Sequence, residues 1–330
     1  MKGTGNRLLR TFLTYGAKML LLLIVVSILA YALVCASPVD PVKQYILGVG
    51  GVSAEQRAEI EDYWGVNDPP VERYINWLNA LLHGDMGSSL LYRRPVAEII
   101  GERFVNSLAL MFCAWLFSGI IGFALGCVMG MNRDKFIDRL LQKICYILAS
   151  APTFWLGLLL LLAFSVWLGW FPIGFSTPVG MINTEVSIWQ RLYHLFLPAL
   201  TLSLMSFANI AMHTRQKLVD VMESEYVLFA RARGEGKRTL LHRHGLRNIL
   251  LPAMTLQFAS FAELFGGSVM AENVFSYPGL GSAVSAAGLS SDVPLLLGIT
   301  LFSALFVCVG NMIANLLYGV IDPQIREVGE

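Results

Sequence analysis

The feature that most constrains the fold is a series of long apolar segments, each separated from the next by a polar stretch. A helix needs about 20 apolar residues to span the roughly 30 Å of bilayer hydrocarbon, and a helix also satisfies its backbone polar groups internally. The sequence therefore predicts an all-α integral membrane protein with six transmembrane helices. We place these helices at residues 12–36, 105–130, 144–169, 195–213, 248–272 and 293–320.

The composition supports this fold class and excludes several functions. The chain is 55% hydrophobic and only 14% charged, whereas a soluble domain carries nearer a quarter of charged residues. The net charge of +1 gives no indication of nucleic-acid binding. The cysteines all fall in apolar runs without metal-ligand spacing, so we interpret them as small buried hydrophobic residues and predict no metal site. They are Cys35, Cys113, Cys127, Cys145 and Cys308.

The distribution of basic residues predicts the orientation. Placing both termini in the cytoplasm puts 17 of the 24 lysines and arginines on the inner side, as the positive-inside rule requires. The first apolar run resembles a signal sequence, but its length and the spans that follow predict an uncleaved helix. The inner segments are then residues 1–18, 131–143, 213–247 and the tail from 322.

These spans suggest a division of the chain into three parts. Residues 1–104 hold the first transmembrane helix and an external loop region, residues 105–322 form the membrane core, and residues 323–330 form a cytoplasmic tail. In the external region, "SAEQRAEIEDYWGV" (53–66) has the pattern of a short amphipathic helix. A second helix is expected after "DPP", with one apolar face. That face holds Ile75, Leu78, Leu81 and Leu82.

The inner loop at 213–247 ends in a polar stretch, "EYVLFARARGEGKRTLLHRHGLRNILLP". A helix over its first residues, ended by Gly234, would place Tyr226, Phe229 and Ala230 on one face. A solvated loop has no need of such a face, whereas a helix that docks on a partner does. The basic residues Arg231 and Arg233 allow two interpretations: contact with the partner, or the ordinary positive charge of an inner loop.

Motifs that carry catalytic chemistry are absent from the sequence. The phosphate-binding pattern GxxxxGK[ST] is missing, and "GEGKRT" lacks its spacing. The sequence also has no HExxH motif, nucleophile elbow or paired carboxylates. We therefore predict that the chain is not an enzyme, has no catalytic residue and binds no cofactor of its own. Its function would be passage through the membrane, with energy supplied by another chain.

The polar stretch resembles the coupling loop of ABC-importer permeases of the peptide/nickel class, whose substrates are dipeptides, oligopeptides or nickel. "GDMGSSLLYRRPV" (84–96), "ENVFSYPGLG" (272–281) and "DPQIR" (322–326) resemble three further segments of that class, in the same order. The matching loop residues are Tyr226, Val227, Ala230, Arg231, Ala232, Gly234, His244, Leu246, Arg247, Asn248, Leu250, Leu251 and Pro252.

This resemblance implies a fold and a set of partners. The fold is that of type I ABC importers, in a bacterial or archaeal cytoplasmic membrane. The partners are a second homologous permease, two ATPase subunits that bind ATP and Mg²⁺, and an external substrate-binding protein. The resemblance also implies that the chain contacts the ATPase through the coupling-loop helix, at Tyr226, Phe229, Ala230, Arg231 and Gly234.

Glu263 is the most informative single residue because it lies in the middle of the fifth span. An acid inside a membrane is costly and indicates a functional site. Either a neighbouring helix satisfies the carboxyl group, or it lines the substrate pathway and meets a cation or a peptide amino group. Nickel-type members resemble the chain here, which favours a metal or metal chelate, but the sequence leaves the substrate open. His213 is isolated in the sequence, and the pair His242 and His244 is a weak metal candidate.

Three glycines of the second span recur at intervals of four residues. Gly122, Gly126 and Gly130 form two overlapping GxxxG steps, which allow close approach of a second helix, so we assign them to helix packing.

The alternative function is a self-sufficient secondary transporter or cation channel that uses Glu263. The polar stretch at 225–252 argues against that alternative, since such a protein needs no ATPase.

Overall fold

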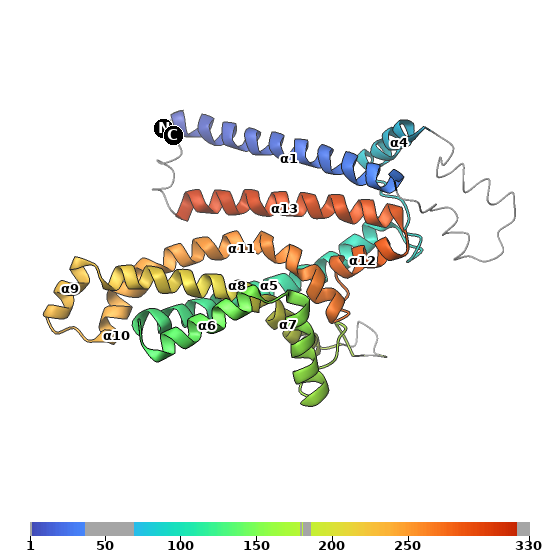
Figure 1. The fold of residues 1–330 in the computed structure, drawn as a ribbon. Helices are drawn as coiled ribbons and strands as arrows, with labels where there is room; N and C mark the ends of the chain where they lie inside the picture. Colours follow the sequence, from blue (N-terminus) through green and yellow to red (C-terminus); the bar gives the residue numbers. More distant parts are fainter. Residues whose placement is uncertain (1, 37–68, 179, 181–185, 322–330) are drawn as a thin grey trace. The chain divides into compact units, whose positions relative to one another are not determined.

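The computed structural model describes the backbone of residues 2–36, 69–178, 180 and 186–321, and their side chains except those of 2–15, 262 and 314–321. The named elements in these ranges are all helices, as predicted (Figure 1). The chain divides into two compact units, one of residues 1–105 with 282–309 and the other of residues 106–281 with 310–330. The amphipathic helix expected at 53–66 lies outside the described residues.

The first unit contains the N-terminal helix and the second external helix predicted from the sequence. The hydroxyl groups of Ser27 and Tyr74 are 2.8 Å apart, and the rings of Tyr74 and Trp77 lie 5.3 and 5.9 Å from that of Tyr31. These aromatic contacts hold the short helix against the end of the long one. The helices of this unit are α1 (Lys2–Ala36), α4 (Pro70–Leu82), the start of α5 (Val96–Met131), most of α12 (Leu280–Leu289) and the larger part of α13 (Val293–Ile321).

Asp292 joins the segment after α4 to the start of α13. Its buried carboxylate accepts hydrogen bonds from the Ser89 hydroxyl at 2.5 Å and the Leu91 backbone N–H at 2.9 Å. The other oxygen accepts a bond from the Leu295 N–H at 3.3 Å. Because an acidic side chain also favours a helix N-terminus, Asp292 both caps α13 and fixes the segment after α4 to it.

The second unit is built around α8. Helices α5 and α6 pack along α8 through apolar side chains, with Phe207, Ala208 and Ala211 of α8 in one buried cluster with Met129 and Cys145. The larger part of α5, from residue 106, belongs to this unit. The elements that lie wholly in it are α6 (Phe136–Ser150), α7 (Thr153–Leu160), the π-helix η1 (Leu161–Trp167), α8 (Ile188–Met222), α9 (Glu225–Ala232), α10 (Lys237–Leu240), the π-helix η2 (Leu241–Gly245) and α11 (Leu246–Val274).

The three glycines assigned to packing lie against α8. Without a side chain, each lets the backbone of α5 come close to its neighbour. A Cβ added at Gly122 would lie 2.8 Å from the Phe207 carbonyl oxygen, at Gly126 2.5 Å from the Thr214 Cβ, and at Gly130 2.9 Å from the Leu218 Cβ.

The third predicted span, at 144–169, is not one straight helix. The helix begins earlier, at Phe136, and breaks between Ser150 and Thr153 with a bend of 110°. Pro152 causes the break, because proline lacks an N–H donor and disfavours helical geometry at the residue before it. Accordingly, Ala151 is extended, with ψ of 137°.

The fourth and fifth helices extend beyond their predicted bounds. α8 starts at Ile188 behind a capping box of Ser187 and Gln190 and continues through the buried Pro198. The run that includes α11 bends by 55° between Phe261 and Glu263. By length and composition, four helices of the described chain can cross a membrane, or up to six if each bent pair counts as one span.

Candidate functional site

The polar stretch of the sequence forms an arm of short helices, residues 223–245, which we call the α9 arm. α9 carries Glu225 in its first turn and Arg231 in its last turn, the arrangement that the helix dipole favours. After α9, the chain reverses at Gly234 and continues through α10 and η2 into α11 (Figure 1). The helix, glycine turn and second helix predicted from the sequence are therefore present.

One face of α9 is buried against the end of α8. Val227, Ala230 and Leu240 form a buried cluster, against which Val221 and Met222 pack. Ala230 is only 5% exposed. The prediction that Ala230 shares an outward face with Tyr226 and Phe229 is thus wrong, because i+4 spacing alone does not say which side of a short helix meets its own protein.

The other face of α9 exposes three large apolar side chains. Tyr226 is 48%, Leu228 50% and Phe229 67% exposed, and Arg231 is exposed beside them. A short helix in a strongly basic segment gains nothing in water from such side chains, since exposed apolar surface is unfavourable. Exposed apolar surface of this kind on a polar segment is typical of a contact with a partner.

Gly234 ends α9 in a conformation that few other residues adopt. Its φ is +88°, its N–H donates to the Arg231 carbonyl at 3.0 Å, and the Glu235 N–H donates to the Ala230 carbonyl at 3.2 Å. These two bonds are the Schellman pattern, in which glycine is favoured at the left-handed position. The turn sets the direction in which the chain leaves α9.

Polar contacts join the residues of the arm that follow Gly234 to one another, and join α9 to the start of α11. Glu235 lies 3.4 Å from His244 and 3.7 Å from Arg243. The side-chain amide of Asn248 donates to the Tyr226 hydroxyl at 3.1 Å. His244 therefore has a contact within the arm, and among the described residues no group of three or more His, Cys, Asp or Glu side chains is placed to hold a metal ion.

A cavity of about 600 Å³ lies between α8, α11 and the break between α6 and α7. The described residues of its wall are mostly apolar and include no lysine or arginine. Apolar cavities with a few polar groups are the usual form of small-molecule sites. The polar side chains of the wall are Thr153, Ser206, Asn209, His213, Ser260 and Glu263.

Among the described residues that line the cavity, Glu263 is the one carboxylate. It is exposed in this chain and lies among the residues that line the cavity. It lies where the run that includes α11 bends by 55°. Of the two sequence interpretations, the exposure supports a carboxylate that lines the cavity over one that a neighbouring helix buries.

The sequence interpretation missed two other residues of the cavity wall. His213, described above as isolated, lies on the wall with Asn209, one turn away on α8. The signal was available: Met205, Ser206, Asn209, Met212 and His213 recur at helical spacing within a mostly apolar helix, which indicates one continuous face.

Comparison with known proteins identifies the family to which this part of the chain belongs. Residues 122–327 match the family described as "Binding-protein-dependent transport system inner membrane component". This range includes the α9 arm, the cavity and the packing glycines.

Three named relatives match over almost their whole length. The chain is 35% identical over 306 residues to the oligopeptide transport system permease protein AppB of Bacillus subtilis (strain 168), covering 92% of this chain and 95% of the relative. It is 34% identical over 319 residues to the glutathione transport system permease protein GsiC of Escherichia coli (strain K12), covering 95% and 99%. It is 32% identical over 304 residues to a putative peptide transport system permease protein of Brucella abortus (strain 2308), covering 92% and 95%.

The family confirms three expectations from the sequence: the peptide/nickel permease class, a location in the inner membrane, and a role as a transport component. It does not fit the alternative of a self-sufficient transporter or channel, because members belong to binding-protein-dependent systems. The chain belongs to the family of inner-membrane permease components of binding-protein-dependent transport systems.

Proposed function

We propose that the chain forms half of the membrane pathway of an ATP-driven importer for peptides. The observation that carries this proposal is the 600 Å³ cavity with Glu263, His213 and Asn209 on its wall. The carboxylate suits the ammonium group of a peptide, and the amide and imidazole suit its backbone groups. Relatives named for oligopeptide and glutathione transport support peptides over the metal chelate that the sequence around Glu263 favoured.

The proposed topology has six spans of the type I importer fold with both termini in the cytoplasm. It counts each bent pair of helices as one span, which the lengths allow. The excess of lysine and arginine in the proposed inner segments supports the orientation. In a variant without native cysteines, Arg231→Cys should react with a membrane-impermeant thiol reagent only from the cytoplasmic side; reaction from outside would overturn the orientation.

The proposed domain division is that of the sequence: residues 1–104, a core at 105–322 with its coupling loop at 213–247, and a tail at 323–330. In this division the coupling loop contains the α9 arm and the last part of α8. The core would then hold both the cavity and the surface that meets the ATPase, so that one unit receives the energy input and contains the pathway.

We propose that the outward face of the α9 arm docks on an ATPase subunit. Tyr226, Phe229 and Arg231 supply the contact, and Gly234 sets its direction. Ala230 serves by packing α9 on α8 rather than by touching the partner. The complete system then contains a second permease, two ATPases that bind ATP and Mg²⁺, an external binding protein and the membrane lipid, and this chain needs no cofactor of its own.

The experiment that tests the substrate uses the cognate substrate-binding protein. It is titrated with dipeptides and oligopeptides, and separately with Ni²⁺ in the presence and absence of small chelators. We expect saturable binding of peptides and no dependence on metal. Binding of Ni²⁺ or its chelates without peptide binding would replace the peptide proposal by a metal one.

A further inference from the structure

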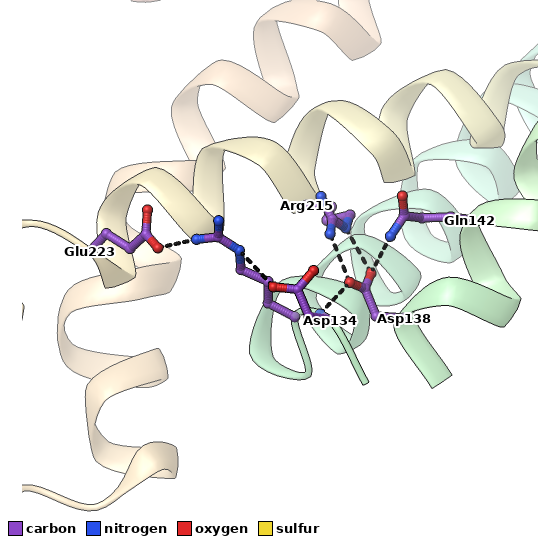
Figure 2. A network of polar contacts seen from close by, with 6 residues as sticks. Asp134, Asp138, Gln142, Arg215 and Glu223 are labelled. Atoms are coloured by element: carbon purple, nitrogen blue, oxygen red, sulfur yellow. Dashed lines mark hydrogen bonds and ion pairs between the residues drawn. The ribbon is translucent and has the colours of Figure 1, made fainter. Parts of the chain in front are cut away.

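A buried ion pair joins α6 to α8 near the C-terminal end of α8, where the α9 arm begins (Figure 2). Asp138 of α6 has no exposed surface. Its two carboxylate oxygens accept hydrogen bonds from Nε and Nη2 of Arg215 on α8, both at 2.7 Å. The same oxygens also accept bonds at 2.9 Å from the Gln142 side chain and from the Asp134 backbone N–H. All the hydrogen bonds that a buried carboxylate needs are thus provided.

This pair fixes geometry more than it adds stability. A buried ion pair is often no more stabilising than apolar side chains of the same size, because both charges lose their hydration. The planar guanidinium of arginine, however, sets both the distance and the angle to a carboxylate when it binds through two bonds. Asp138 and Arg215 therefore hold α6 at one register along α8.

The α8 end of this connection carries the α9 arm. Val221 and Met222, about two turns beyond Arg215, pack in the buried cluster of the arm. Glu223, the next residue, forms an ion pair with Arg133 from the turn before α6 (Figure 2). A displacement of α9 is consequently passed to the last turns of α8, where Arg215 and Glu223 both reach toward the start of α6.

The other end of α6 reaches the cavity. α6 is a single helix of 15 residues, about 22 Å long, and apolar contacts at Leu141, Cys145 and Leu148 hold it along α8. Ala149, next to its last residue, and Thr153, just after the Pro152 break, both line the cavity. Helix α6 thus extends as one rigid element from the place where the α9 arm begins to the cavity wall.

We infer that the Asp138–Arg215 pair is a positioning element that makes α6 follow α8 when an ATPase displaces the α9 arm. The inference rests on the proposed function and extends it. Through this pair, movement of the arm reaches the cavity wall at Ala149 and Thr153. Without it, α9 and α8 still respond to the ATPase, but only apolar contacts and the exposed Arg133–Glu223 pair connect α6 to α8. α6 then follows α8 less closely, and less peptide is transported for each ATP hydrolysed.

The test compares transport with ATP hydrolysis in the reconstituted complex of the permeases, ATPases and binding protein. In Asp138→Asn, and in Arg215→Lys, which keeps the charge but not the two parallel bonds, we expect assembly and basal ATP hydrolysis to be retained. Peptide uptake per ATP hydrolysed should fall about tenfold, within the usual range of coupling energies between sites. The double variant Asp138→Arg with Arg215→Asp should recover a substantial part of that loss.

The matched control is an exposed ion pair with a similar distance between its nitrogen and oxygen atoms. Arg94 and Glu102 lie 3.0 Å apart with half-exposed side chains, and such pairs contribute little. Glu102→Gln should leave uptake per ATP at the wild-type value. Because the wild-type complex is measured first, its failure to take up peptide would count against the proposed function and not against the ion pair.

Three results would overturn the inference. The first is wild-type uptake per ATP in both single variants. The second is failure of both variants to assemble with the ATPases, which would make the pair a requirement for folding. The third is an assembled charge-swapped double variant that transports no better than Asp138→Asn.

Discussion

At the scale of single residues, the cavity wall contains one residue that could be predicted from the sequence, Glu263, and one that could not, His213. An acid in the middle of an apolar span is conspicuous, so Glu263 was found from the sequence. His213 was not, because a histidine near a polar loop resembles many others until the fold places it on the same wall. Asp138 and Arg215 escaped for a related reason: they lie 77 positions apart in the sequence.

The first prediction concerns Glu263. Glu263→Gln keeps the size of the side chain and removes its charge, so it removes a charge-assisted contact with the substrate. Peptide uptake by the reconstituted complex should fall about tenfold, in line with the loss of one charged hydrogen bond. Assembly with the ATPases should be unchanged.

The matched control for Glu263 is Glu98→Gln on α5. Glu98 is exposed, and its partner Arg94 keeps a second carboxylate at Glu102. This variant should transport like the wild type. Unaltered uptake in Glu263→Gln would show that the charge of Glu263 does not contribute to transport and that the residue is not part of the pathway.

At the scale of elements, the helices were predictable and their interruptions were not. Apolar length predicts where a span lies, but the break at Pro152 depends on the backbone of Ala151, and the earlier start of α6 depends on packing against α8. Proline itself was not a sufficient signal, since Pro198 is accommodated within α8. Likewise, the helix α9 was predicted correctly, but the choice of its buried face needed the contacts of Val227 and Ala230.

Gly234 gives a prediction for the α9 arm. In Gly234→Ala, a Cβ is forced into the left-handed region, which costs about 1–2 kcal/mol and redirects the chain after α9. Co-purification of the ATPases should weaken by several-fold. The matched control is Gly236→Ala, because Gly236 has φ of −71° and open space around its Cβ position. Equal ATPase binding by the two variants would show that the turn does not orient the arm.

Gly126 gives a prediction for the packing of α5 on α8. In Gly126→Ala, the added Cβ would lie 2.5 Å from the Thr214 Cβ and 2.7 Å from the Ala211 carbonyl oxygen. Such overpacking costs about 1–3 kcal/mol, so the purified chain in detergent should unfold at a lower temperature. Gly101→Ala on the same helix meets nothing within 4 Å and should be neutral or slightly stabilising. A Gly126→Ala variant as stable as Gly101→Ala would contradict the close contact.

At the scale of the whole molecule, the α9 arm and the cavity belong to the same compact unit. In the proposed function, the contact with the ATPase and the substrate pathway are therefore joined by a few helices rather than by a flexible linker. Family membership was predictable from the order of short motifs along the chain and is confirmed by relatives that match over nine-tenths of it. The substrate was not predictable from the sequence, because one carboxylate in a span fits a metal ion as well as a peptide ammonium group.

The most direct test of the central claim is peptide uptake into proteoliposomes that contain ATP. The vesicles carry the two permeases with or without the ATPases, and the binding protein is supplied outside. We predict uptake only when the ATPases, ATP and the binding protein are all present. Uptake by the permeases alone, driven by an ion or peptide gradient, would contradict the account and identify the chain as a self-sufficient transporter.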